Sequence, residues 1–206
     1  MRHRLVLFDF DGTLADSFPW FASMLNEVAA RFGFRQLPPE AIDELRGLDT
    51  QAILRRLEVP VWKLPAIAAH MRTRIAADIH QMQLFPGIPE ALRTIAARAD
   101  VGIVSSNAAP TIQRILGPET AALVRHWECG ASLFGKASRL KRVLGRAKVP
   151  AAEAIYVGDE IRDARAAKSC GLRFGAVSWG YNLPAALAAE QPDLLFASVA
   201  EMAAAL

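Results

Sequence analysis

The chain has 206 residues, of which 52% are hydrophobic and 22% charged, a balance that excludes a disordered protein and predicts a packed core. This length suits one domain, or one domain that carries a smaller inserted one. The formal net charge is only +3 with scattered basic residues, which favours a solvated basic surface over a nucleic-acid-binding patch and would also suit anionic substrates. The N-terminal apolar run is too short for a signal peptide or a membrane span, so we expect a cytoplasmic protein that binds neither membrane nor nucleic acid.

The two cysteines and four histidines show no metal-binding spacing. This pattern predicts reduced structural thiols and no zinc site.

Short, continuous apolar runs predict strands that are buried on both faces. In chain order these strands are Leu5–Phe10, Val101–Ser105, Ala154–Val157, Arg173–Val177 and, more weakly, Leu194–Phe196. Helices are predicted at Ile88–Arg98, Pro110–Leu116, Lys136–Ala147, Ile161–Cys170 and in the Ala-rich tail Ala197–Leu206. This alternation is typical of an α/β fold with a doubly wound, Rossmann-like parallel sheet.

The region from Asp16 to Leu84 interrupts the alternation, because it contains no convincing strand and its apolar residues recur at helical spacing. We interpret residues 16–84 as a small α-helical bundle. It would be inserted into an α/β core domain made of residues 1–15 and 85–206, which resumes at Phe85-Pro86-Gly87.

Two aspartates end the first predicted strand. Asp9 closes a strongly apolar run, where a carboxylate is costly unless it is paired or bound to metal. Asp11 begins a turn that Gly12 permits. One carboxylate could attack phosphorus while the other protonates the leaving oxygen, but a plain Asp-Gly turn explains this motif equally well on its own.

Small polar residues follow the second predicted strand. Ser105, Ser106 and Asn107 offer hydroxyl and backbone N–H groups to a phosphate oxygen, or they form a simple helix N-cap. The carboxyl ends of parallel strands line a common crevice, so these residues can converge with the aspartates of the first strand.

A lysine and two further aspartates complete the pattern. Lys136 opens a helix against the helix dipole, which a nearby anion would explain, and the other basic residues of that helix (Arg139, Lys141 and Arg142) are expected to face solvent. Asp159 and Asp163 stand one helical turn apart after a strand. That spacing suits a Mg²⁺ site, or an acidic first helical turn.

Together, the Asp9-x-Asp11-Gly12-Thr13 string, the serine, the lysine and Gly158-Asp159-x-x-x-Asp163 resemble the haloacid dehalogenase superfamily of aspartate-nucleophile phosphatases. The resemblance covers nearly the whole chain. The wider string to Ser17 is similar to members with a helical C1-type cap, especially the phosphoglycolate phosphatase-like ones.

The resemblance implies a role for each residue. Asp9 would form an aspartyl-phosphate and Asp11 would be the general acid and base. The substrate phosphate would be bound by Gly12, Ser105, Ser106, Asn107 and Lys136. Mg²⁺ would be held by Asp9, the backbone carbonyl of Asp11 and Asp159, with Asp163 nearby. Residues 16–84 would be a helical cap domain over an α/β catalytic core domain of residues 1–15 and 85–206. The cap would move on hinges at Leu14–Ser17 and Leu84–Gly87, and Arg46 would contact the substrate unless it is an ordinary surface arginine.

We therefore expect a Mg²⁺-dependent phosphoric monoester hydrolase, a monomer or homodimer, acting on a small phosphorylated metabolite. A sugar-phosphate mutase and a non-catalytic phosphate- or metal-binding module remain alternatives. Ala137-Ser138-Arg139 replaces the Pro-x-Pro that follows the lysine in many relatives, the phosphate ligand could shift from Ser105 to Ser106, and the role of Glu160 is open.

Overall fold

The computed structural model describes residues 3–130 and 135–206. Residues 1–2 and 131–134, including Phe134 beside the predicted Lys136 motif, lie outside the described residues. In the described part of the chain, no helix combines the length and apolar character needed to cross a bilayer.

Six parallel strands form the main sheet in the order β5-β4-β1-β6-β7-β8, which confirms the predicted α/β fold. The strands are β1 (Leu5–Phe8), β4 (Asp100–Val104), β5 (Val124–Glu128), β6 (Ala154–Gly158), β7 (Arg173–Val177) and β8 (Leu194–Phe196). Strand β1 lies at the centre between β4 and β6, so the residues that follow these three strands are brought close together.

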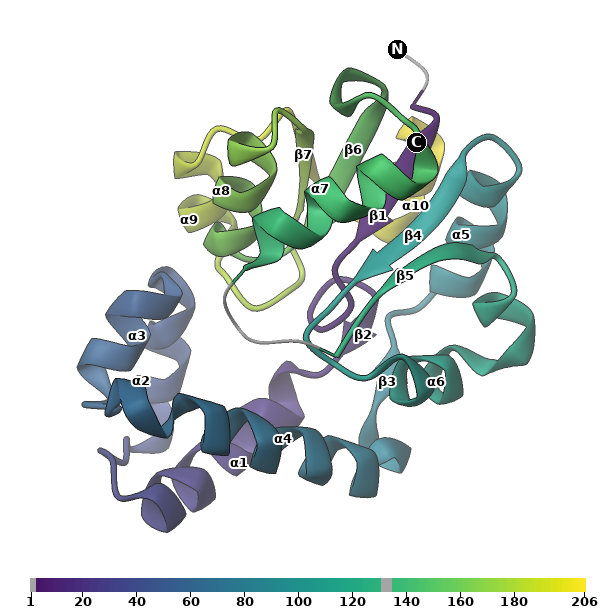
Figure 1. Cartoon of the computed structure of the whole chain (residues 1–206). Coiled ribbons are helices and arrows are strands. Elements are labelled where there is room, and N and C mark those ends of the chain that lie inside the picture. The colour runs from purple at the N-terminus through teal and green to yellow at the C-terminus, as the bar shows by residue number, and fades with distance from the viewer. Residues whose placement is uncertain (1–2, 131–134) are drawn as a thin grey trace.

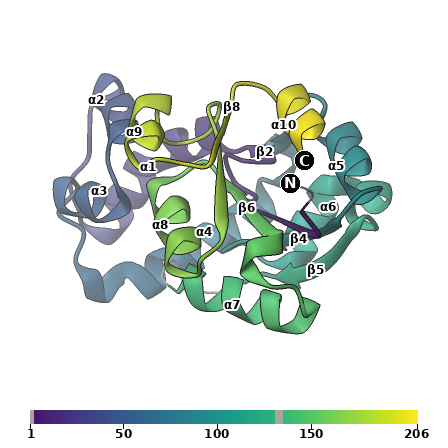
Figure 2. The same cartoon turned by 90° about the horizontal axis from the view of Figure 1, so that it is seen from above.

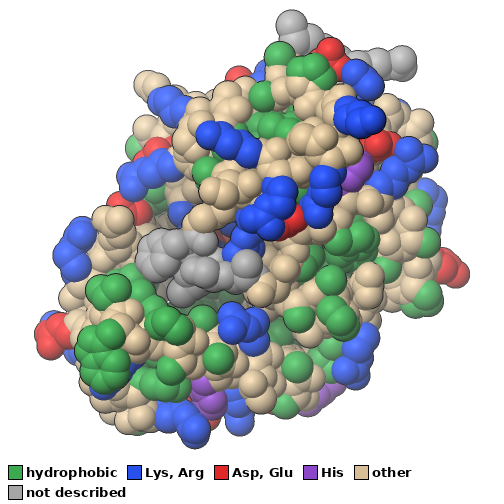
Figure 3. All heavy atoms as spheres, viewed as in Figure 1, with side chains coloured by type: hydrophobic (Ala, Val, Ile, Leu, Met, Phe, Trp, Pro, Cys, Tyr) green, Lys and Arg blue, Asp and Glu red, His purple; other side chains and the backbone are tan. Residues whose placement is uncertain are grey.

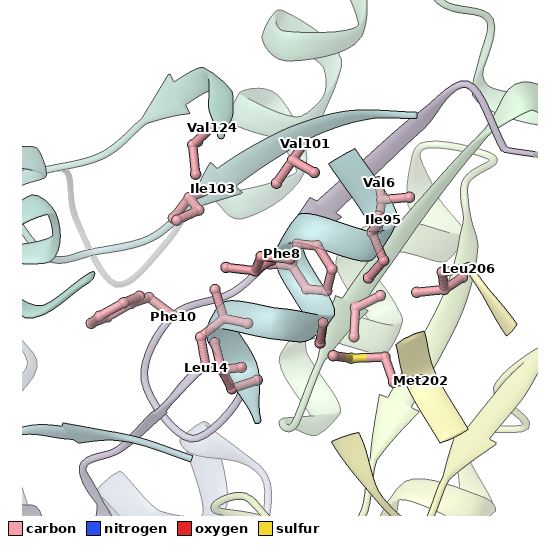
Figure 4. Packing of buried hydrophobic residues seen from close by; sticks show 14 of the residues in the cluster. Val6, Phe8, Phe10, Leu14, Ile95, Val101, Ile103, Val124, Met202 and Leu206 are labelled. Atoms are coloured by element: carbon pink, nitrogen blue, oxygen red, sulfur yellow. The ribbon is translucent and has the colours of Figure 1, made fainter. Parts of the chain in front are cut away.

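Helices cover both faces of the sheet, as Figures 1 and 2 show. On one face lie α5 (Ile88–Ala96), α6 (Ala109–Ala121) and α10 (Val199–Ala205), and on the other α7 (Lys136–Ala147), α8 (Ile161–Ser169) and α9 (Pro184–Ala189). The alternation along β1 divides the core, because Val6 and Phe8 pack into the first cluster (Figure 4) and Leu5 and Leu7 into the second. Both faces of β1 are therefore fully buried, as its continuous apolar run predicts.

Strand β5 was not predicted from the sequence. It lies at the edge of the sheet, and its burial alternates irregularly, with Arg125 exposed and His126 and Trp127 only half-buried. An edge strand of this kind carries no continuous apolar run to reveal it.

The helical insertion, defined here as Phe18–Gln81, lies below the carboxyl ends of the strands in Figure 1. It contains α1 (Phe18–Phe32), α2 (Pro39–Glu44), α3 (Thr50–Arg56) and α4 (Leu64–Ala77), together with the 3₁₀ turns η1 (Leu45–Gly47), η2 (Val61–Lys63) and η3 (Ile79–Gln81). Lys and Arg side chains are spread over both the sheet part and the insertion on the face shown in Figure 3.

A two-stranded antiparallel ribbon joins the helical insertion to the sheet. Its strands are β2 (Ala15–Asp16) and β3 (Gln83–Leu84), so the chain enters and leaves the insertion at one place. The expectation that residues 16–84 contain no strand is wrong at these two ends, where a pair of residues is too short to produce a recognisable pattern.

Candidate active site

The carboxyl ends of β1, β4 and β6 place five of the predicted residues at one edge of the sheet. Asp9, Ser105 and Asp159 come from the ends of these neighbouring strands. Lys136 and Asp163 reach the same edge from the first turns of α7 and α8. Residues up to 154 positions apart in sequence are thus adjacent because of the strand order alone.

Three buried carboxylates form the centre of this edge. Asp9, Asp159 and Asp163 are each at most 3% exposed, and one oxygen of each lies within 4.8 Å of the others. The Lys136 ammonium donates to Asp9 Oδ2 at 2.6 Å and to Asp163 Oδ1. The backbone N–H of Phe10 donates to Asp9 Oδ1 at 2.8 Å. One ammonium is therefore shared by two carboxylates, and Asp9 is held at both oxygens.

Asp159 is positioned by a different set of donors. Thr13 Oγ1 donates to Asp159 Oδ1 at 2.7 Å, and the Tyr181 backbone N–H donates to Asp159 Oδ2 at 2.8 Å. The backbone passes very close on both sides. A Cβ at Gly12, where φ is 72°, would lie 2.1 Å from Asp159 Oδ2, and a Cβ at Gly180 would lie 2.2 Å from Asp159 Cβ. Only glycine fits at either position without displacing this carboxylate.

The cluster carries more negative charge than Lys136 alone can balance. Burial, followed by the neighbouring acids Glu160, Asp163 and Asp9, raises the pKa of Asp159 well above its usual range. Burial also raises the pKa of Asp163, although the Lys136 charge opposes it. A buried, oxygen-only donor set with surplus negative charge matches the requirements of a hard divalent cation such as Mg²⁺.

Asp11 lies beside this cluster and lines a cavity. The side-chain amide of Asn107 donates to both Asp11 oxygens, at 3.1 and 2.8 Å. Burial, and then the negative charge of Asp9, raise the pKa of Asp11 to about 7. A carboxyl group with this pKa can both release and accept a proton near neutral pH.

The loop after β4 forms a polar turn next to Asp11. Ser105 is fully buried, and its Oγ accepts a hydrogen bond from the Asn107 backbone N–H at 3.1 Å. Its hydroxyl proton therefore remains available for another acceptor. Ser106 is half-buried and lines the cavity.

Arg139 supports this turn, contrary to the expectation that it faces solvent. It is 4% exposed, and its Nη1 donates to the Ser105 carbonyl at 3.0 Å. Arg139 follows Lys136 by three positions, so both side chains lie on the face of α7 that packs toward the sheet. Lys141 and Arg142 are exposed, as predicted.

Glu160 and Arg162 line the same cavity as Ser106 and Asn107. Glu160 is the N-cap of α8 and forms a capping box with Asp163, and Arg162 Nη2 donates to Glu160 Oε1. No role was predicted for Arg162. The sequence offered one signal, its place in the first turn of a helix that begins at the same edge of the sheet as the aspartates.

Arg46 connects the helical insertion to the loop after β7. Its Nε donates to the Tyr181 carbonyl at 3.1 Å and its Nη2 to the Gly180 carbonyl at 3.0 Å, while its guanidinium lies 4.9 Å from the Phe18 ring centroid. Asn182 fastens the same contact, since its Nδ2 donates to the Arg46 carbonyl at 2.8 Å. Sequence reasoning assigned nothing to this loop, although it follows a predicted strand and the crevice rule applies to it.

Comparison with known proteins places this geometry in a family. The haloacid dehalogenase-like hydrolase family matches residues 6–177. The chain is 31% identical over 199 residues to a phosphoglycolate phosphatase from Synechococcus elongatus, covering 96% of this chain and 94% of the relative.

Solved structures agree on the fold. A haloacid dehalogenase-like family hydrolase from Streptococcus pneumoniae superposes with a TM-score of 0.81 and 22% identity, over 98% of each chain. CbbY from Rhodobacter sphaeroides, in complex with phosphate, gives a TM-score of 0.75 with 22% identity, over 97% of this chain and 96% of that one.

The fold and the site define an α/β enzyme with an aspartate- and lysine-lined catalytic edge. The chain belongs to the haloacid dehalogenase-like hydrolase family. The match confirms the resemblance inferred from the motifs. It also confirms the prediction of an enzyme, and the Synechococcus elongatus relative is by name a phosphoric monoester hydrolase.

Proposed function

We propose that the protein is a Mg²⁺-dependent phosphatase that hydrolyses a small phosphorylated metabolite through an aspartyl-phosphate on Asp9. The observation that carries the proposal is the buried set of Asp9, Asp159 and Asp163, in which Lys136 pairs with Asp9 and Asp163, with Asp11 lining the adjoining cavity. The phosphoglycolate phosphatase name of the Synechococcus elongatus relative supports the same reaction class.

Mg²⁺ would be held by Asp9 and Asp159, with the Asp11 carbonyl as a further ligand and Asp163 nearby. When bound, it would neutralise the surplus negative charge and polarise the phosphoryl oxygens. Lys136 would contribute a second positive charge between Asp9 and the phosphoryl group. Without these charges, the carboxylates would repel a phosphate dianion.

In the first half of the reaction, a carboxylate oxygen of Asp9 attacks phosphorus and the ester P–O bond breaks. The Asp11 carboxyl donates its proton to the departing alkoxide oxygen, so the product leaves as a neutral alcohol. Asn107 orients Asp11 through its two hydrogen bonds. Ser105 or Ser106 donates a hydroxyl proton to a phosphoryl oxygen, with Gly12 and Asn107 lining the same subsite.

In the second half, the Asp11 carboxylate takes a proton from water as that water attacks the phosphorus of the aspartyl-phosphate. The bond between phosphorus and Asp9 breaks, which releases inorganic phosphate and restores the Asp9 carboxylate and the protonated Asp11 carboxyl. A pKa of about 7 allows Asp11 to act as acid and then as base.

Residues 16–84, which contain the helical insertion, would act as a cap over the candidate active site, with hinges at Leu14–Ser17 and Leu84–Gly87. The β2–β3 ribbon supports this hinge position, since both passages of the chain lie together there. Closure would exclude bulk water from the phosphoryl group. Three side-chain nitrogens of Arg46 already donate to oxygens of this chain in the structure. Arg46 would therefore have to break some of these hydrogen bonds to contact a substrate.

The test is phosphate release by the full chain from 4-nitrophenyl phosphate and a panel of phosphorylated metabolites, with Mg²⁺ or with a chelator. We expect Mg²⁺-dependent release, and a loss of at least roughly 10³-fold in Asp9→Asn, which removes the nucleophile. Glu119→Gln, at an exposed carboxylate of α6 outside the site and the hinges, is the control and should retain activity.

Substantial turnover by Asp9→Asn would overturn the nucleophile assignment. Conversion of a sugar phosphate to its isomer without free phosphate would instead identify a mutase.

A further inference from the structure

A cavity of about 260 Å³ connects the catalytic edge with the interior of the helical insertion. It begins beside Asp11 and Asn107 and extends between α1, α3 and α4. Its inner walls include Phe21, Ile53 and Met71. We call this inner part the apolar chamber.

Polar and apolar groups are separated along the cavity. At the catalytic end, polar groups bind one another, although Arg162 Nε is buried there without a hydrogen-bond partner among the described residues. Asn107 binds Asp11, and Arg162 binds Glu160. Within the helical insertion, apolar side chains form most of the lining, and Arg46, Thr50 and Arg72 are among the few polar ones. A molecule whose phosphoryl group reaches Asp9 would therefore place its remaining atoms against hydrocarbon.

Apolar walls favour substrates with an apolar leaving group over substrates with a charged one. A small charged leaving group such as glycolate gains nothing from hydrocarbon contact, and its carboxylate would lose hydration there. A dry apolar cavity of about 150 Å³ is sufficient to bind benzene. The whole cavity, at about 260 Å³, exceeds that size, so it has room for a carbon skeleton beside a phosphoryl group.

We propose that the apolar chamber receives the leaving group, and that the preferred substrates are phosphate monoesters of alcohols with an apolar alkyl or aromatic skeleton. This inference rests on the proposed phosphatase function and names its substrate class. It departs from the small, charged substrate in the name of the Synechococcus elongatus relative.

Binding of non-hydrolysable alkylphosphonates tests the proposal directly. Methyl-, propyl-, butyl- and hexylphosphonate would be titrated into the Mg²⁺-loaded full chain by calorimetry. Each methylene that enters the chamber should lower Kd about fourfold, which corresponds to the transfer free energy of a methylene group. A Kd that stays constant or rises along the series would overturn the proposal.

Two alanines of α4 provide a matched pair of variants. Ala68 lines the cavity, whereas its neighbour Ala69 is exposed to solvent. Ala68→Phe should weaken hexylphosphonate at least tenfold and leave methylphosphonate within twofold of the wild type. Ala69→Phe should change neither value. If Ala68→Phe raises Tm and leaves every Kd unchanged, the cavity is only a packing void and the proposal fails.

Activity assays separate this inference from the proposed function. kcat/KM for n-alkyl phosphates and benzyl phosphate would be compared with kcat/KM for 2-phosphoglycolate. A preference for the apolar esters supports the chamber. Efficient turnover of 2-phosphoglycolate with a flat alkyl series would overturn the chamber alone. Chain-length-dependent phosphonate binding without hydrolysis of any ester would support the chamber and overturn the phosphatase function.

Discussion

The catalytic edge of the sheet is formed by buried polar side chains, whereas the cavity in the helical insertion is lined mainly by apolar ones. At the edge, buried polar groups hold one another. Asp9 accepts from Lys136 and the Phe10 N–H, and Asp159 from Thr13 and the Tyr181 N–H. In the insertion, a small apolar cluster of Leu25, Leu37, Ile42, Leu45 and Leu57 lies next to a cavity that apolar side chains line. Hydrogen bonds and ion pairs therefore fix the orientation of the side chains at the edge, whereas the insertion provides an apolar space of a certain shape and volume.

This difference separates the residues proposed to carry out the reaction from those proposed to select the substrate. In the proposed mechanism, directional contacts at the edge set the chemistry, because a misplacement of about 1 Å in a catalytic constellation can cost roughly 10²-fold in rate. Apolar walls tolerate volume-conserving exchange at a cost of about 1.5 kcal/mol or less. Changes at the edge should therefore affect every substrate, and changes in the insertion should affect some substrates more than others.

Lys136→Met tests the edge most severely. It leaves Asp9 and Asp163 buried without their ammonium, and loss of one partner of a buried ion pair costs about 3–5 kcal/mol. We expect activity to fall at least about 10³-fold for all substrates, since the loss also removes transition-state charge neutralisation. Phosphate release and thermal melts with and without Mg²⁺ measure both effects.

Lys141→Met is the control for that substitution, because Lys141 is exposed on the same helix. It should leave activity and Tm near the wild-type values. Activity of Lys136→Met within tenfold of the wild type would contradict the proposed role of the ammonium.

Gly12→Ala tests the edge through its backbone. The new Cβ would meet Asp159 Oδ2 at 2.1 Å, and the residue has a left-handed φ of 72°. Displacement of Asp159 should lower kcat/KM by about 10²-fold and weaken Mg²⁺ binding, which calorimetry measures. Gly145→Ala, within α7 and with no atom inside 4 Å of its Cβ, should retain activity and gain up to about 1 kcal/mol in the free energy of unfolding. Equal behaviour of the two variants would argue against close packing at Asp159.

Sequence reasoning anticipated the edge better than the insertion, for physical reasons. Strands buried on both faces leave continuous apolar runs, and strand ends in a parallel sheet converge by rule. Asp9, Asp159 and Lys136 therefore met as expected. Arg139 was misplaced, although its spacing from Lys136 puts both on one helix face. The cavity in the insertion had no signal, because a void depends on how four helices pack and not on the pattern of any one.

Asn182→Ala tests the connection between the two regions. Its Oδ1 accepts from the Ile161 N–H at 2.9 Å, and its Nδ2 donates to the carbonyls of Arg46 and Leu48 at 2.8 and 3.0 Å. The variant leaves these groups unsatisfied, at about 1–3 kcal/mol. Hydrogen exchange of the Leu183 amide, which donates across the same contact to Arg46, should accelerate at least tenfold.

Asn26→Ala separates loosening of this contact from general destabilisation. Asn26 makes a similar pair of hydrogen bonds, but both join it to Leu37 inside the helical insertion. This variant should lower Tm without accelerating exchange at Leu183. Faster exchange at Leu183 in both variants would show that Asn182 has no special part in joining the two regions.

Asp49 makes the smallest contribution, and pH should reveal it. Its Oδ1 accepts from the Ala52 N–H at 2.8 Å as the N-cap of α3, and its Oδ2 accepts from Arg165 of α8 at 2.9 Å. These bonds, the one from Ala52 first, hold the pKa of Asp49 below its usual value. The stabilisation is therefore complete above the unfolded pKa of about 3.9, and it disappears as pH falls through the lower folded value.

Urea unfolding at pH 7, 5, 4 and 3 should show this dependence. Asp49→Ala should lose about 1 kcal/mol at pH 7, as removal of an N-cap does. Asp49→Asn keeps a capping side chain, so it should lose only the ionic part, about 0.2–1 kcal/mol. The gap between wild type and Asp49→Asn should stay constant from pH 7 to 5 and close below pH 4. A gap that widens with acid would contradict the lowered pKa, because a charge that stabilises the fold must be lost when the carboxyl is protonated in both states.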